Sequence, residues 1–251
     1  MEITNETLKT QLNHRSIRVF EKEPLAKEQL TAIYEAARHT STSQFLQQFS
    51  ILRITDEVKR KAISEIAKQD YVGGNGELLI FLADLNRNAK IRQHLGKDIA
   101  RLQTADLFFQ AVNDTVLAVQ NALLAAESMG LGGVVLGSIN NEPKKLVEVL
   151  ELPKLTYPVL GLQLGHPAQS PQLKPRLPLE FTVFDDKYPA DFPLAEFEDY
   201  DKSVHQYYDL RDTNRRVDEF TTQIGSNKLA TQKSSRDEIM AAIQAQGLCL
   251  D

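Results

Sequence analysis

The chain has 251 residues, of which 42% are hydrophobic and 25% charged, the balance of a soluble globular protein with a buried core. Its formal net charge of −5 gives no general attraction to nucleic acid or anionic membranes, and its longest apolar run, residues 78–83, is too short to span a bilayer. The acidic residues 1–6 lack the basic and apolar parts of a signal peptide, and Cys249 is the single cysteine. These features predict a cytoplasmic protein with no internal disulfide, no metal site built from cysteines and neither a membrane nor a nucleic acid as partner.

Helical and strand patterns alternate along the first part of the chain. A helix is predicted where apolar residues recur with helical spacing, at Leu30, Ile33, Tyr34 and Ala37. Residues 49–54 have the composition of a strand, and a short helix with Val58 and Ile66 on its inner face is expected after it. Residues 78–83 are apolar at every position, which predicts a central strand covered on both faces.

The longest helical pattern covers residues 98–129. Neither glycine nor proline occurs between Lys97 and Met129, and apolar residues occupy much of the helix circumference. Such a helix is expected in a core or at a subunit interface. It should end at the glycines of residues 130–133, and the pattern then predicts a strand at 134–136, a helix from Asn141–Pro143 and a strand at 157–164.

The composition changes after Gly165. Four prolines between residues 167 and 178 predict an extended arm, because proline removes a backbone donor and cannot continue a helix. The last helix is expected to begin with a capping box of Ser235 and Glu238 and to end at Gly247.

These elements predict one α+β domain over residues 1–251. Its core is expected to cover about residues 1–178, and a C-terminal arm with a helical extension to cover about residues 179–251. Acids dominate residues 191–209, whereas six basic residues face three acids in residues 211–236.

Several common kinds of site are excluded. The five histidines lack the paired spacing of a metal site, and the chain has neither a GxSxG elbow nor a GxxxxGK[ST] phosphate loop. The glycines from Gly130 onward do not fit a dinucleotide-binding turn, because Val135 stands where the third glycine belongs. The predicted order is also helix then strand, the reverse of that fold.

Three segments carry basic or hydroxyl groups suited to an anionic ligand: His14–Arg18, Thr40–Gln44 and Leu173–Pro178. Arginine binds phosphate with two parallel hydrogen bonds, so the first segment could clamp a phosphate. In isolation, each segment also has a simpler interpretation. The first would be a charged surface turn, the second a loop that ends a helix, and the third a solubilising extended arm.

In combination, these segments join others in a specific order. The chain also has Lys68-Gln69-x-Tyr71-Val72, Gly130-Leu131-Gly132-Gly133-x-x-x-Gly137 and Gly165-x-Pro167. The ordered set spans nearly the whole chain and resembles the nitroreductase family, in particular its branch of oxygen-insensitive NADPH nitroreductases and NADPH–flavin oxidoreductases. The resemblance implies a nitroreductase-like α+β fold with a central, mainly antiparallel sheet flanked by helices. It also implies a homodimer that holds FMN at its interface, with both subunits contributing to each site and residues 98–129 in the dimer core.

The resemblance assigns cofactor roles residue by residue. Arg15, Ser16 and Arg176 would meet the FMN phosphate or ribityl chain, and Lys174 would approach the phosphate or the ring edge. His14 and Arg18 would lie against the pyrimidine end of the ring. Hydrogen bonds to the ring and the ribityl hydroxyls are assigned to Ser41, Thr42, Ser43, Gln69 and Tyr71. Backbone N–H groups near the reactive N5 are assigned to Leu136, Gly137 and Ser138. Ser138 departs from the branch, where a second glycine is common, and its side chain would change access to the ring edge if it points at the flavin.

The basic stretch near the C-terminus has two interpretations. Arg211, Arg215 and Arg236 stand where this branch uses arginines for the 2′-phosphate and pyrophosphate of NADPH, with Arg216 as an alternative to Arg215. The other interpretation is a solvated helix face in which neighbouring acids pair with these arginines.

The function implied is hydride transfer from NADPH, or from NADH, through bound FMN to nitroaromatics, quinones or free flavin, with ping-pong kinetics. A catalytic side chain is not expected, because the flavin carries the hydride. One alternative is a flavin reductase that releases reduced FMN to a partner, and another is a flavin-binding module with low turnover. A nucleic-acid binder is disfavoured by the acids of residues 191–209.

Overall fold

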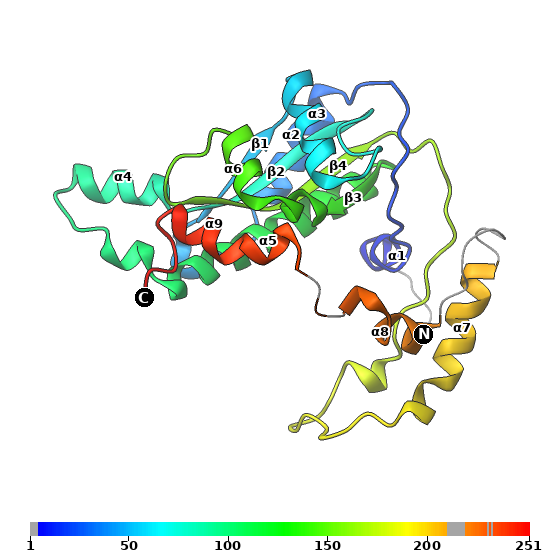
Figure 1. The fold of residues 1–251 in the computed structure, drawn as a ribbon. Helices are drawn as coiled ribbons and strands as arrows, with labels where there is room; N and C mark the ends of the chain where they lie inside the picture. The colour runs from blue at the N-terminus through cyan, green and yellow to red at the C-terminus, as the bar shows by residue number, and fades with distance from the viewer. Residues whose placement is uncertain (1–4, 210–218, 230, 232) are drawn as a thin grey trace. The chain divides into compact units, whose positions relative to one another are not determined.

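The computed structural model describes residues 5–209, 219–229, 231 and 233–251 (Figure 1). The chain forms two compact units. The first contains residues 1–170 and 234–251, and the second contains residues 171–233. Among the described helices, none combines the length and the apolarity that crossing a membrane would require.

The first unit is built on a four-stranded sheet in the order β1-β2-β4-β3, and every neighbouring pair is antiparallel. The strands are β1 (Phe49–Arg53), β2 (Glu77–Asp84), β3 (Gly132–Leu136) and β4 (Thr156–Gly165). The helices of this unit are α1 (Glu6–Leu12), α2 (Lys27–Arg38), α3 (Glu57–Ala67), α4 (Asn86–His94), α5 (Ala105–Ser128), α6 (Pro143–Val149) and α9 (Ile239–Ala245). The predicted α+β class with a mainly antiparallel sheet is confirmed.

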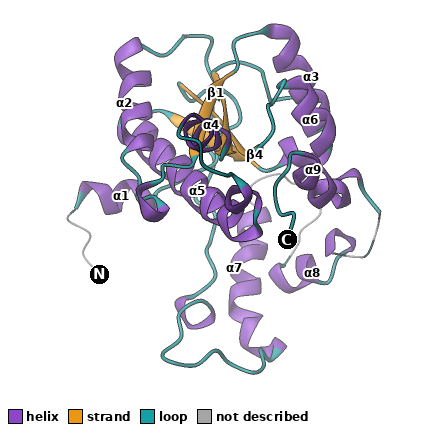
Figure 2. Cartoon of the chain, turned by 90° about the vertical axis from the view of Figure 1, so that its left-hand side faces the viewer, coloured by secondary structure: helices purple, strands orange, loops and turns teal. Residues whose placement is uncertain are grey.

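The central strand β2 is buried along its whole length, and its alternate side chains enter two separate cores. Ile80 and its neighbours in the same phase pack with α3 and α6, whereas Leu79 and Phe81 pack with α2 and α5. Figure 2 shows the sheet between these two pairs of helices. Burying one such side chain contributes about 1.5–3 kcal/mol, which explains why residues 78–83, covered on both faces, are all apolar. This confirms the interpretation of residues 78–83.

Helix α3 differs in one detail from the sequence prediction. Val58, expected on the inner face, is 78% exposed, and Arg60 occupies a buried position of the helix together with Ile63 and Ile66. The side chain of Asp56 accepts a hydrogen bond from the backbone N–H of Lys59, at 2.8 Å, and so caps the start of the helix.

Helix α5 begins later than predicted and is not covered on all sides by its own chain. Thr104 caps its first turn, and residues 100–103 form a separate short 3-10 turn, so the helix starts at Ala105 rather than at residue 98. One face packs on the sheet and on α2. The opposite face leaves Phe109, Val116 and Leu117 exposed, so of the two places predicted for this helix, the core of its own chain accounts for one face only.

The last segment of the chain packs in the first unit and not in an extension. The capping box lies one residue earlier than expected, with Ser234 and Asp237 as its members. Ala242, Ile243 and Leu248 then join a core with the start of α5, and Gly247 ends the helix with a φ of +80°.

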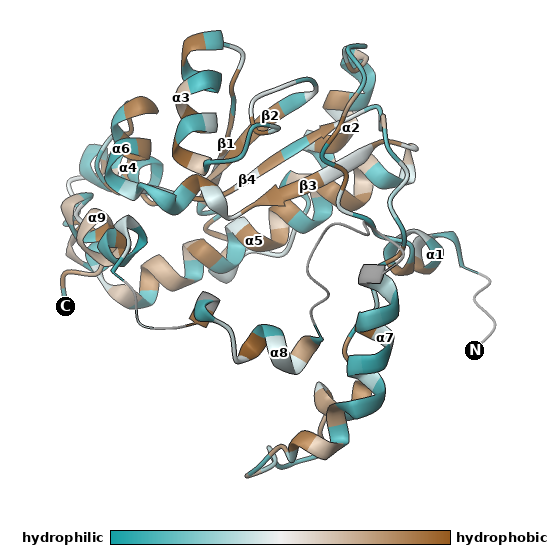
Figure 3. Cartoon of the chain, turned by 45° about the vertical axis from the view of Figure 1, so that its right-hand side comes forward, coloured by the Kyte–Doolittle hydropathy of each residue, from teal (hydrophilic) through white to brown (hydrophobic). Residues whose placement is uncertain are grey.

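The second unit contains α7 (Glu198–Asp209) and α8 (Phe220–Ile224). Phe197 stacks between Phe181 and Phe220, with ring centroids 4.3 and 6.0 Å away, and these rings form the apolar centre of this unit. Helix α7 carries three acids in its first turn and is largely hydrophilic in Figure 3.

Candidate functional site

The N-terminal segment lies beside strand β3. Ser16 forms a parallel bridge with Gly133, and the backbone N–H of Ile17 donates to the carbonyl oxygen of Gly133 at 3.0 Å. This approach requires glycine at position 132, because a Cβ atom there would lie 2.5 Å from Cγ1 of Ile17. The glycines after α5 therefore allow His14–Arg18 to lie along the sheet.

Side chains from three separate segments meet at the residues predicted to contact the flavin. The hydroxyl groups of Tyr71 and Ser138 both donate to Oε1 of Gln69, at 2.6 and 3.1 Å. The guanidinium of Arg18 lies over the ring of Tyr71, 5.9 Å from its centroid, within the range of a cation–π interaction. The side chain of Ser138 thus bonds to Gln69.

The loop after β3 also receives an arginine from the last segment. Nη1 of Arg236 donates to the carbonyl oxygen of Gly137 and to Oδ1 of Asn141, both at 3.0 Å.

Burial raises the pKa of Tyr157 to about 12, and the positive charge of Arg236 acts in the opposite direction. Leu136 points its side chain into the core, so this residue can offer only backbone groups to a ligand.

The basic side chains of His14 and Arg15 differ in their partners. The Nε atom of Arg15 is buried and has no hydrogen-bond partner among the described residues. Nδ1 of His14 lies 2.5 Å from Oε1 of Glu127 on α5. A buried guanidinium nitrogen without a partner is costly unless an anion binds there, so Arg15 fits the phosphate of a nucleotide cofactor.

The hydroxyl segment 41–43 lies at a different part of α5. The backbone N–H of Ser43 donates to Oδ1 of Asp114 at 2.8 Å. Asp114 and Glu127, the partner of His14, are 13 residues apart on this helix, or about 20 Å at roughly 1.5 Å per residue. One chain does not bring residues 41–43 together with His14.

The remaining predicted residues are placed as follows. In the second unit, Nη1 of Arg176 donates to the carbonyl oxygen of Lys174 at 2.7 Å. Arg211 and Arg215 lie outside the described residues. Groups of histidine, cysteine and acidic residues that could hold a metal ion are absent from the described part of the chain.

Two buried residues that the sequence analysis missed hold the loop that carries Gln69 and Tyr71. The guanidinium of Arg60 donates to the carbonyl oxygens of Ile54, Gly73, Gly74 and Gly76. The amide of Gln163 on β4 accepts from the N–H of Gly73 at 2.9 Å and donates to the carbonyl oxygen of Tyr71 at 3.0 Å. The available signal was a glutamine within an otherwise apolar strand, since a buried amide needs partners.

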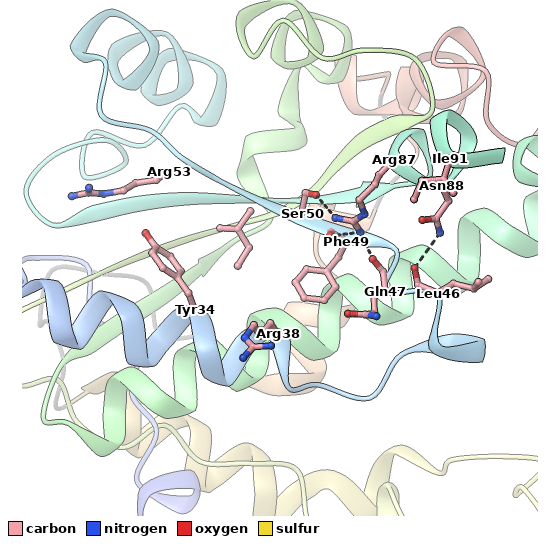
Figure 4. Close-up of a pocket in the computed structure, with 11 residues that line it drawn as sticks. Tyr34, Arg38, Leu46, Gln47, Phe49, Ser50, Arg53, Arg87, Asn88 and Ile91 are labelled. Carbon is pink, nitrogen blue, oxygen red and sulfur yellow. Dashed lines mark hydrogen bonds between the residues drawn. The ribbon is translucent and has the colours of Figure 1, made fainter. Parts of the chain in front are cut away.

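A separate groove of about 830 Å³ lies between α2, β1 and α4 (Figure 4). Its lining includes Tyr34, Arg38, Arg53 and Arg87, and none of the predicted flavin contacts is among the described residues that line it. The three arginines already pair with Glu35, Glu77 and Asp84, so the groove offers little net positive charge to an anion.

Comparison with known proteins identifies the family of this chain. Residues 12–166 match the model of the nitroreductase family, and residues 174–251 match the model of the C-terminal domain of that family. The chain belongs to the nitroreductase family.

Individual relatives cover nearly the whole chain. It is 41% identical to the oxygen-insensitive NADPH nitroreductase of Salmonella typhimurium over 96% of this chain and 97% of the relative. It is 37% identical to the NADPH-flavin oxidoreductase of Vibrio harveyi over 97% and 98%. Among solved structures, nitroreductase A from Vibrio parahaemolyticus aligns with a TM-score of 0.87 at 36% identity, over 99% of this chain and all of that chain. The NADPH:FMN oxidoreductase from Vibrio harveyi complexed with NAD+ aligns with a TM-score of 0.86 at 35% identity, over 98% and 100%.

Proposed function

We propose that this chain is an FMN-dependent NAD(P)H oxidoreductase of the nitroreductase and flavin reductase type. It passes reducing equivalents from NADPH to nitroaromatics, quinones or free flavin, and the reductant and the acceptor bind in turn with ping-pong kinetics. The observation that carries the proposal is the set of contacts that joins Arg18, Gln69, Tyr71 and Ser138, together with the bond of Arg236 to Gly137. The same N-terminal segment contains the buried Arg15 nitrogen, which has no partner among the described residues. The names of the relatives, an NADPH nitroreductase and an NADPH-flavin oxidoreductase, support the same activity.

Each residue of this cluster has a role that its chemistry permits. Arg15 would bind the FMN phosphate, with Ser16 beside it, and Arg18 would stabilise negative charge at the pyrimidine end of the ring. His14, held by Glu127, would lie at the same end. Because the oxygen of Gln69 already accepts two hydroxyl donors, its amide NH₂ group is the part suited to donate to a ligand. When bound, FMN supplies the acceptance and donation of hydride, so no acid or base from the chain is required.

The position of residues 41–43 supports a homodimer in which both copies contribute to each site. These residues lie about 20 Å along α5 from the partner of His14, so they can reach a flavin at His14 only from a second copy. The exposed apolar residues Phe109, Val116 and Leu117 on α5 supply a surface for that second copy.

Arg236 is the best placed candidate for NADPH. It bonds to the carbonyl oxygen of Gly137, next to the predicted flavin contacts, and its other guanidinium nitrogens can meet a phosphate. Arg211 and Arg215 remain proposed partners of the NADPH phosphates, and Lys174 and Arg176 remain proposed partners of FMN. NADH is the alternative reductant.

We also propose that residues 1–251 act as one functional domain and that the enzyme works in the cytoplasm. A single cysteine cannot form a disulfide within the chain, which suits a reducing compartment.

The experiment that tests the function is anaerobic reduction of the purified protein. We expect a yellow dimer with FMN absorbance that bleaches when NADPH is added and recovers when a quinone or a nitroaromatic follows. A yellow protein that NADPH does not bleach would instead favour the alternative, a flavin-binding or flavin-supplying protein with low turnover. A colourless protein that takes up no added FMN would rule out both.

A further inference from the structure

Asp114 is a buried acid that the cofactor assignments leave without a role. It lies in the middle of α5, its residue is 1% exposed, and no ion pair to it occurs in the part of the chain that the structure describes. Its two carboxylate oxygens are both used by backbone donors. Oδ1 accepts from the N–H of Ser43 at 2.8 Å, and Oδ2 accepts from the N–H of Gln48 at 3.1 Å.

The two amides are the ends of a strained loop. Between them, Gln44, Phe45 and Gln47 all have φ between +51° and +59°, a conformation that costs free energy for any residue other than glycine. Such a loop keeps its shape only if surrounding bonds hold it. One carboxylate that binds both ends across the loop restrains it directly, and hydrogen bonds to a charged acceptor are among the strong ones.

The opposite side of this loop is held by α4. Nδ2 of Asn88 donates to the carbonyl oxygen of Leu46 at 3.1 Å, and the guanidinium of Arg87 donates to that of Gln47 (Figure 4). The loop is thus fixed from two sides by side chains of the same unit. The hydroxyl residues 41–43 lead directly into it.

We propose that Asp114 is a positioning residue that holds residues 41–48 in the shape in which they present Ser41, Thr42 and Ser43 to the FMN bound by a second copy of the chain. This inference rests on the proposed function. Asp114 touches neither flavin nor substrate, and it acts through the backbone of Ser43 and Gln48.

The chemistry of the site requires a carboxylate. Two N–H donors converge on one side chain, so it must offer two acceptor oxygens. Asparagine has the same size but offers one oxygen, and its NH₂ group would face the second N–H donor. Asp114→Asn therefore loses one hydrogen bond and places its own NH₂ group against the second backbone N–H, but it leaves no cavity.

The test measures FMN affinity in the full-length protein by quenching of flavin fluorescence. We expect Asp114→Asn to raise the Kd for FMN roughly 10- to 100-fold, because fewer molecules hold the loop in the binding shape, while the protein stays dimeric in light scattering. The matched control is Thr115→Val, the next residue on α5. The hydroxyl of Thr115 is also buried and donates to the carbonyl oxygens of Leu82 and Ala111, away from the loop. This control should lower the melting temperature but change the Kd less than threefold.

A second measurement has one part that needs no variant. Hydrogen exchange of the flavin-free wild-type protein should show slow exchange at the amides of Ser43 and Gln48. In Asp114→Asn, exchange at both amides should become faster. Fast exchange at both amides in the wild type would overturn the inference. So would an Asp114→Asn protein whose Kd for FMN matches that of Thr115→Val at a similar loss of melting temperature.

A failure of the proposed function and a failure of the role of Asp114 would give different results. A wild-type protein that binds no FMN removes the proposed function, and the inference with it. A wild-type protein that binds FMN, beside an Asp114→Asn protein that binds it equally well, removes only the role of Asp114.

Discussion

The exposed apolar face of α5 leads to a prediction about assembly. Leu117 is 47% exposed and lies beside Val116 on the face of α5 that its own chain leaves open. Leu123, by contrast, is 2% exposed and packs in the core of its own chain. We expect Leu117→Asp to give folded monomers that retain little FMN, whereas Leu123→Asp would unfold the chain and say nothing about assembly.

The magnitude follows from the exposed half of the side chain. Complete burial of a leucine contributes about 1.5–3 kcal/mol, so covering the exposed half of Leu117 is worth about 1 kcal/mol. A twofold interface contains each residue twice, which gives about 2 kcal/mol, or about 30-fold in the dimer Kd. Burial of two unpaired carboxylates adds several kcal/mol more, so the dimer should weaken about a thousandfold or more.

The assay is sedimentation or light scattering over a range of protein concentrations, with FMN content measured on the same samples. The matched control is Val58→Asp on α3, which places the same charge at a residue that is 78% exposed and lies outside the proposed interface. It should remain a yellow dimer. A Leu117→Asp protein that is monomeric and holds FMN as tightly as the wild type would refute the reasoning that each site needs two copies.

Three other predictions concern the site and its surroundings. A mixed dimer with Arg15→Ala in one chain and alanines at residues 41–43 in the other should bind half the wild-type amount of FMN at wild-type affinity; binding at neither site would mean that each site uses a single chain. Arg236→Ala should raise KM for NADPH about tenfold and KM for NADH much less, as steady-state kinetics can test, because only NADPH carries the additional phosphate. Burial raises the pKa of Tyr157 to about 12, so between about pH 10 and that value the folded state keeps a proton that the unfolded chain loses. The free energy of unfolding should therefore fall as the pH rises through this interval, and Tyr157→Phe should make the fall smaller, as denaturant titration at each pH can check. The same substitution should cost about 1 kcal/mol at neutral pH through the lost bond to Asn140.

The sequence predicted the features whose causes are local. The apolar run of residues 78–83 has to lie between two layers, and the glycines after Met129 end a helix, whatever the rest of the chain does. Boundaries were less well determined. The start of α5 and the capping box of the last helix were displaced, because several neighbouring residues could cap each of them and packing selects one.

What the sequence by itself determined, then, was the class of fold, the order of the elements and the residues that resemble a flavin site, because hydrophobic periodicity and motif spacing are properties of neighbouring residues. Only the tertiary structure decided which polar groups meet. Glu127 lies 113 residues from His14, Asp114 lies 71 residues from Ser43, and Gln163 lies 90 residues from Gly73. Each of these acceptors comes close to its donor only when the chain has folded. A buried donor without an acceptor costs free energy, so the packing of the whole chain selects these partners, and no local sequence pattern can.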